Sequence, residues 1–328
     1  MAGSFALFTI LEDHDYVRGS FHEACLRNDE ARVKAHLDGK GVDRDEPDLQ
    51  AYRTPLHYAC LGGHLNIVIL LVQAGASLGT PKLWKGKYLL PAVFYATHSG
   101  SETVLSYLIK RGASLTEVHR NVTLMHVATR EANLRMMDFL IQKGADVNVV
   151  TDLLSPLHVA CQCGHMEAAQ LLVNNGAMLK SRRQAPSPLH YAAESGATGI
   201  IKLLLESGAP VNDFACGDTP FLRACKTSQV EAAKILLEYN ADLHINFEET
   251  FGSPLHLAVK SGVMEMVVLL LESGAVVFTK TQTGATPLHF AAMLGHYEIA
   301  RLLLRFGAEV NDPRSDNGRT ALHEAVEH

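Results

Sequence analysis

The stretch Thr54-Pro-Leu-His57 is followed by Tyr-Ala-Cys60, by Gly-Gly-His64, by the apolar run Ile67-Val-Ile-Leu-Leu71 and by Ala74-Gly-Ala76. The opening four residues return later with Ser or Thr in first place, and these copies begin at Ser155, Ser187, Ser253 and Thr286. Weaker copies begin at Thr123, Thr219 and Thr320. A motif that recurs at a nearly constant distance indicates an internal repeat, so the repeat decides the fold class.

One alanine marks the register of the repeat. It stands at Ala24, Ala59, Ala96, Ala128, Ala160, Ala192, Ala224, Ala258, Ala291 and Ala325. The mean interval between these positions is about 33 residues, a period typical of repeats built from a turn and two helices.

Each conserved element of the motif has a physical role. The Ser or Thr hydroxyl is expected to cap a helix, and the Pro after it occupies the first helical position, where no N–H is needed. Leu157 and Ala160 are expected to lie in the buried stripe of that first helix, and Met166–Val173 has the apolar spacing of a second helix. Gly176 is expected to end the second helix in the left-handed conformation.

The motif and its period resemble the ankyrin repeat. The resemblance implies an all-α solenoid of about ten stacked repeats, each a helix-turn-helix followed by a β-hairpin finger. Residues 1–19 are then an N-terminal extension, and residues 20–328 form a single repeat domain whose last repeat stops inside its first helix. We interpret that stop as the truncation of a longer parent chain. The polar segment Glu30–Leu37 fits the second helix of a capping repeat.

Two departures from the pattern concern the fingers. Residues 77–90 are expected to form an enlarged finger that contains Trp84 and Lys87. Insertions in repeat proteins map to one face, which is often the binding face. The four alanine intervals from Ala96 to Ala224 are each one residue shorter than the usual period, which predicts tighter hairpins there.

Composition narrows the range of partners. The chain carries 29 Lys and Arg against 35 Asp and Glu, a formal net charge of −6, so it has no general electrostatic affinity for nucleic acid or for an anionic membrane. No apolar run approaches the ~18 residues that a membrane span needs. Six cysteines are too few for a disulfide scaffold in 328 residues, which favours a reducing compartment, cytoplasmic or also nuclear.

Catalytic or metal chemistry has little support in the sequence. Most of the 17 histidines fall at two fixed positions of the repeat, and in ankyrin proteins the first of these bonds the backbone of the neighbouring finger. Cys161 and Cys163 lie two residues apart on one helix and therefore point in different directions, away from a shared metal ion. No nucleotide-binding or hydrolase motif occurs, so we expect no catalytic centre, no metal and no cofactor.

A geometric rule gives the candidate partner-binding residues. Residues just before each Ser or Thr cap, and those two to three after the register alanine, are expected to face the concave groove. These are Arg53, Arg130, Leu154, Gln162, Arg183, Glu194, Asp218, Lys226, Lys260, Met293 and Leu294, joined by Trp84 and Lys87 from the long finger. The excess of cations in the middle of this set predicts an acidic or phosphorylated partner segment.

The resulting functional hypothesis is a non-catalytic protein–protein interaction scaffold, a monomer on its own, that binds a protein or peptide. The Ser-Pro-Leu-His copies with short fingers are similar to the arrays of SOCS-box proteins, which implies a substrate receptor of a cullin-RING ubiquitin ligase. The alternatives are a targeting module of a larger enzyme or channel, or an inhibitor that occludes a partner's site. The resemblance also implies candidate asparaginyl hydroxylation at finger positions with Leu eight residues earlier, namely Asn148, Asn212 and Asn311.

Overall fold

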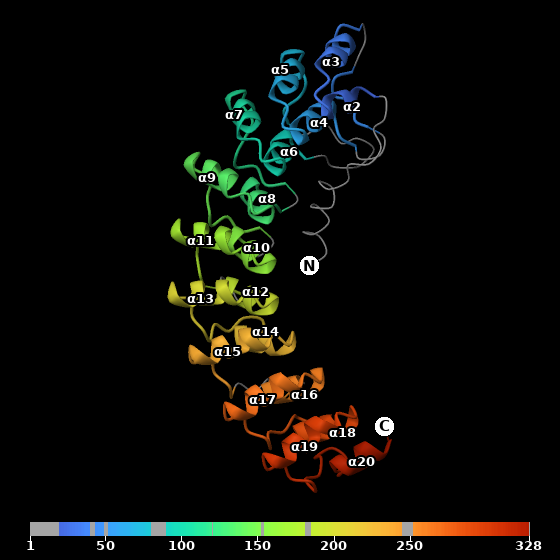
Figure 1. The fold of residues 1–328 in the computed structure, drawn as a ribbon, viewed down its shortest axis with the longest axis vertical. Helices are drawn as coiled ribbons and strands as arrows, with labels where there is room; N and C mark the ends of the chain where they lie inside the picture. Colours follow the sequence, from blue (N-terminus) through green and yellow to red (C-terminus); the bar gives the residue numbers. More distant parts are fainter. Residues whose placement is uncertain are drawn as a thin grey trace. The chain divides into compact units, whose positions relative to one another are not determined.

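The computed structural model describes residues 20–39, 43–48, 52–79, 90–119, 121–151, 154–180, 185–244 and 252–327, to which all structural statements below refer. The chain divides within one helix into two compact units. Unit 1 comprises Met1–Ala160 with Asn174–Ala177, and unit 2 comprises Cys161–Val173 with Met178–His328. The sequence predicts one domain for residues 20–328, and each unit is a stack of helix pairs of that repeat type (Figure 1).

The helices of unit 1 alternate between first and second helices of the repeat. They are α2 (Phe21–Leu26), α3 (Glu30–Leu37), α4 (Pro55–Leu61), α5 (Leu65–Gln73), α6 (Ala92–His98), α7 (Glu102–Lys110), α8 (Leu124–Arg130), α9 (Leu134–Gln142) and the start of α10 (Pro156–Cys163). First helices pack on first helices, as α2 does on α4 and α4 on α6, and α5 packs on both α3 and α7. Figure 1 shows the two kinds of helix in separate rows.

Unit 2 repeats the arrangement. Its helices are α11 (Met166–Asn174), α12 (Pro188–Ser195), α13 (Thr198–Glu206), α14 (Pro220–Lys226), α15 (Val230–Glu238), α16 (Pro254–Ser261), α17 (Met264–Glu272), α18 (Pro287–Met293), α19 (Tyr297–Arg305) and α20 (Ala321–Glu327). Helix α14 packs between α12 and α16, and α15 packs between α13 and α17.

The caps form as the motif predicts. In α4, the Thr54 hydroxyl accepts a hydrogen bond from the His57 backbone N–H at 3.4 Å, and Pro55 is the first helical residue. The second helices predicted at Glu30–Leu37 and Met166–Val173 are α3 and α11. Gly176 adopts φ of 80°, the left-handed conformation expected at the end of α11.

The register alanines form the core between repeats. Nine of them are at most 1% exposed, from Ala24 to Ala291, because a methyl group is all that fits where neighbouring first helices meet. Ala325 on α20 is exposed, since no further repeat packs on that helix among the described residues. Cys25, Cys60, Cys161 and Cys225, each directly after a register alanine, are also fully buried.

Three fingers are tight, and they lie between Ala96 and Ala224, where the shortened alanine intervals predict tighter hairpins. Within the described ranges no strand forms, and three fingers carry a single antiparallel bridge: His119 with Val122, Thr151 with Leu154, and Ala215 with Asp218. Two residues separate the partners of each bridge, so these fingers are too short for a second pair of bridged residues.

Candidate partner-binding surface

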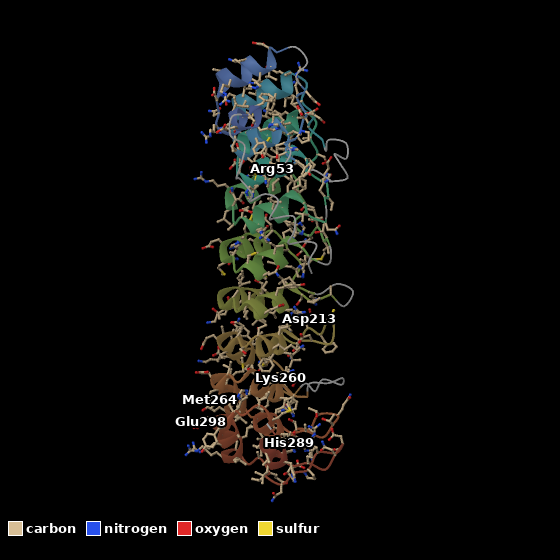
Figure 2. The ribbon with its side chains drawn as sticks, turned by 90° about the vertical axis from the view of Figure 1, so that its right-hand side faces the viewer. Arg53, Asp213, Lys260, Met264, His289 and Glu298 are labelled. Atoms are coloured by element: carbon tan, nitrogen blue, oxygen red, sulfur yellow. The ribbon has the colours of Figure 1, made fainter. Side chains whose placement is uncertain are left out.

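The first repeat histidine ties its repeat to the next one in four copies, at His126, His190, His256 and His289. In unit 2, His256 Nδ1 accepts the backbone N–H of Ser253 at 3.0 Å, so the ring proton lies on Nε2, which donates to the carbonyl of Ala285 at 3.1 Å. His289 (Figure 2) bonds the carbonyl of Arg319 in the same way. In unit 1, His126 bonds the carbonyl of Leu154. The structural role that the ankyrin resemblance implied for these histidines is confirmed.

Burial keeps His57, His126 and His256 neutral. Desolvation lowers the pKa of His57 to about 3 and that of His126 and of His256 to about 4. At neutral pH these rings are therefore uncharged, as the backbone bonds to both nitrogens of His126 and of His256 require.

The same bonds correct half of the geometric rule for the binding surface. Asp218, just before the cap of α14, supplies the carbonyl that His190 of the preceding repeat binds at 3.4 Å, so it lies between two repeats. Arg53 is 0% exposed and Asp218 is 6% exposed, whereas Leu154 is half-buried. The prediction that Arg53 and Asp218 face a groove is wrong.

Arg53, labelled in Figure 2, belongs to a buried cluster in unit 1. Its guanidinium carbon lies 5.8 Å from the ring centre of Tyr58 and 5.7 Å from that of Tyr95. The Asp48 carboxylate accepts the backbone N–H of Arg53 at 2.9 Å and the hydroxyl of Tyr58 at 3.0 Å. Burial, with Asp48 beside the hydroxyl, raises the pKa of Tyr58. This arginine stabilises the fold.

The other half of the rule places its residues at the surface. Positions two and three after the register alanine lie in the last turn of each first helix, or directly after it. Lys226, Lys260 (Figure 2) and Leu294 are exposed, and Arg130, Gln162, Glu194 and Met293 are half-buried. Their accessibility agrees with the prediction, and partner contact by these residues remains a prediction.

Arg223, which the sequence analysis missed, connects three of the predicted residues in unit 2. It donates to Glu194 at 2.7 Å and lies 3.5 Å from Asp218, whose carboxylate also accepts Lys226 Nζ at 3.0 Å. Its guanidinium stacks on Tyr191 at 5.5 Å. The one available signal was its position directly before Ala224, where four other repeats have Tyr or Phe and none has a cation. Because Lys226 is paired with Asp218, it does not contribute the unbalanced positive charge that the sequence suggested.

Three predicted residues lie outside the described ranges. They are Trp84 and Lys87 of the enlarged finger, and Arg183.

The candidate hydroxylation sites differ in their contacts. The amide of Asn148 donates to the Gly176 carbonyl at 2.9 Å, and that of Asn212 to the Asn240 carbonyl at 3.3 Å, so both serve the next turn. Asn311 is exposed, and the described residues give its amide no such bond. Hydroxylation stays a prediction, and we expect Asn311 to react first.

Two further searches bear on chemistry and membranes. Across the described ranges, no three His, Cys, Asp or Glu side chains gather as a metal site would require. Cys161 is buried and Cys163 is exposed, consistent with side chains two residues apart pointing in different directions. The helices of the described ranges are all too short or too polar to span a bilayer.

Comparison with known proteins supports the repeat assignment. A family model described as ankyrin repeats (3 copies) matches residues 21–119, 124–215, 211–281 and 255–328. The chain is similar to the ankyrin repeat domain of Bcl-3, described as a unique member of the IkappaB protein family, with 27% identity over 65% of this chain and 94% of that chain, and a TM-score of 0.55.

A second solved structure is similar to the same extent. The human ASB11 ankyrin repeat domain has 25% identity over 68% of this chain and 99% of that chain, with a TM-score of 0.59. Because the family model matches nearly the whole described chain and the histidines bridge consecutive repeats, the chain belongs to the ankyrin-repeat family and is a protein–protein interaction scaffold.

Proposed function

We propose that the chain binds a partner protein on the ends of the first helices of unit 2, as the substrate-recognition part of a cullin-RING ubiquitin ligase. The binding surface comprises the last turns of α14, α16 and α18, with Lys226, Lys260, Met293 and Leu294, and we call it the first-helix surface. The observation that carries this assignment is the contrast in solvent exposure along each of these helices. Nearly every other residue of these helices is buried against a neighbour, so only these ends are free to vary with the partner.

The chemistry of the first-helix surface favours a mixed partner segment. Met293 and the 40% exposed Leu294 supply apolar anchorage, and Lys260 supplies an exposed cation. An acidic or phosphorylated residue of the partner fits best at Lys260, because at Lys226 it would compete with the Asp218 carboxylate.

The ligase role rests on the likeness to the ASB11 domain, which agrees with the similarity of the repeat motifs to SOCS-box proteins. It predicts that the endogenous protein, purified from its own cells, carries elongin and cullin subunits together with its partner. If the purified complex contains the partner but neither elongin nor cullin, the scaffold function stands and the ligase role is contradicted.

The surface itself is tested with a matched pair of variants. Lys260→Glu combined with Leu294→Asp alters the first-helix surface, whereas Lys202→Glu combined with Leu304→Asp alters exposed residues of second helices. We expect the first variant to weaken partner binding about tenfold or more, with an unchanged melting temperature, and the second to bind normally. A loss of binding only in the second variant would place the partner on the second helices.

A further inference from the structure

A second surface lies on the opposite kind of helix, in unit 1. The second helices α5, α7 and α9 form a shallow groove of about 430 Å³. Its apolar lining comes from Leu65, Tyr107 and Phe139, while Glu102 lies at the start of α7 and Lys110 at its end. Figure 1 shows these three helices in one row.

Three cations surround the aromatic end of this groove. Arg111 lies 5.1 Å from the Tyr107 ring centre, Lys143 lies 5.5 Å from that of Phe139, and Lys110 lines the groove itself. None of the three forms an ion pair with another residue of the described ranges.

The helix dipole alone does not account for these cations. A positive charge at a helix C-terminus is favourable in general. The corresponding ends of α13, α15 and α17 in unit 2 nevertheless carry Glu206, Glu238 and Glu272. The repeat therefore folds with either sign of charge at this position, and the cations of unit 1 are available for another role.

The groove also contains an unsatisfied polar group. The hydroxyl of Tyr107 is closed off from solvent in the groove wall, and within the described residues it has no hydrogen-bond partner. A buried hydroxyl without a partner is unfavourable, so a turn of the Tyr107 side chain toward an acceptor beside Lys110 would gain both a charge interaction and this bond.

We propose that this groove binds an acidic segment of a partner protein, with carboxylates near Lys110, Arg111 and Lys143 and an apolar side chain between Tyr107 and Phe139. A protein segment fits better than a nucleic acid. The chain as a whole carries a net charge of −6, which repels a long polyanion. The apolar lining of the groove makes no favourable contact with a phosphate backbone. The site goes beyond the first-helix surface, since it lies on other helices of another unit.

The first test uses a fluorescein-labelled peptide of Glu and Leu, with a Lys and Leu peptide of the same pattern as the charge control. We expect fluorescence anisotropy to show binding of the acidic peptide alone, and Lys110→Glu combined with Arg111→Glu to weaken it about tenfold or more. The matched control is Lys202→Glu combined with Lys234→Glu, which line the corresponding groove between α13 and α15. Equal loss in both double variants, or tighter binding of duplex DNA than of the acidic peptide, would overturn the proposal.

The second test isolates the hydroxyl. Tyr107→Phe keeps the ring and removes the oxygen, so we expect an undiminished melting temperature and several-fold weaker binding of the acidic peptide. A lower melting temperature with unchanged affinity would overturn the assignment of the hydroxyl to the groove. The Lys260 and Leu294 variant should bind this peptide normally, so failure at this groove is distinguishable from failure at the first-helix surface.

Discussion

Two arginines, Arg53 in unit 1 and Arg223 in unit 2, are surrounded by the same chemistry and do different things. Each follows an aspartate by five residues and lies over a tyrosine ring. Arg53 is fully buried, its guanidinium lies near the rings of Tyr58 and Tyr95, and its backbone N–H donates to the carboxylate of Asp48. Arg223 keeps 17% of its side chain exposed and pairs with two carboxylates.

The difference between them comes from position within the repeat. Arg53 stands immediately before the cap of α4, a position enclosed between two repeats. Arg223 lies in α14, directly before the register alanine, where the side chain reaches the surface. A charge at the enclosed position depends entirely on partners within the protein, whereas a charge at the surface is also solvated by water. The Arg53 cluster is therefore part of the core, and the Arg223 network can rearrange around a partner.

The largest expected effect is that of Arg53→Ala. The change removes a fully buried side chain that lies near two tyrosine rings, so unit 1 should lose about 3 kcal/mol of unfolding free energy. Denaturant unfolding followed by circular dichroism measures it. A loss below that of Arg223→Ala would contradict the contrast between the two sites.

Acid should destabilise both units through their buried histidines. The folded pKa of His126 in unit 1 and of His256 in unit 2 is about 4, below the ordinary value near 6.5, so the unfolded state binds more protons between these values. Stability is then fully present above pH 6.5 and is lost as the pH falls toward 4, by about 2 kcal/mol per histidine at pH 5.

Unfolding free energies measured from pH 7 to pH 5 test this expectation, and a value that does not change with pH would contradict it. The same titration sharpens the comparison of the units. Arg53 lowers the pKa of His57, after the larger effect of desolvation, so Arg53→Ala should raise that pKa and weaken the acid dependence of unit 1.

The Arg223 network should give smaller effects. Arg223→Ala leaves Glu194 and Asp218 without their shared cation and should cost about 1 kcal/mol, with a cost that falls at high salt. Lys226→Ala should cost less than about 0.5 kcal/mol, because Asp218 keeps Arg223. Melting curves of both variants at low and high salt distinguish these contributions. Equal losses of stability in the two variants would contradict the larger role given to Arg223.

The smallest effect is a difference in reactivity without any change in stability. Cys25 and Cys60 of unit 1 are buried, and burial raises the pKa of Cys25 to about 12, whereas Cys163 and Cys216 of unit 2 are exposed. Thiol titration of the native protein should therefore modify only Cys163 and Cys216, and all six cysteines after unfolding. In the Arg53→Ala variant, Cys60 should become reactive at lower denaturant than in the wild type.

The sequence by itself determined the repeat, its register and its local structure. A hydroxyl followed by proline starts a helix through interactions within four residues, and glycine ends one in the same local way, so α3, α4 and α11 were predictable almost to the residue. The structural role of the histidines and the burial of the register alanines were predictable as well, because these positions recur in most copies.

Only the tertiary structure decided which charges are buried and which are paired. Arg53 and Asp218 were placed on the surface by a rule based on spacing, but the structure buries both, and the Asp218 carbonyl accepts a hydrogen bond from His190 of the previous repeat. The Glu194, Arg223 and Lys226 network likewise joins different repeats, and so does the groove of α5, α7 and α9. Spacing within one repeat specifies a helix and its caps, whereas burial and ion pairing depend on what the neighbouring repeat brings into contact, and that contact exists only after the repeats have stacked.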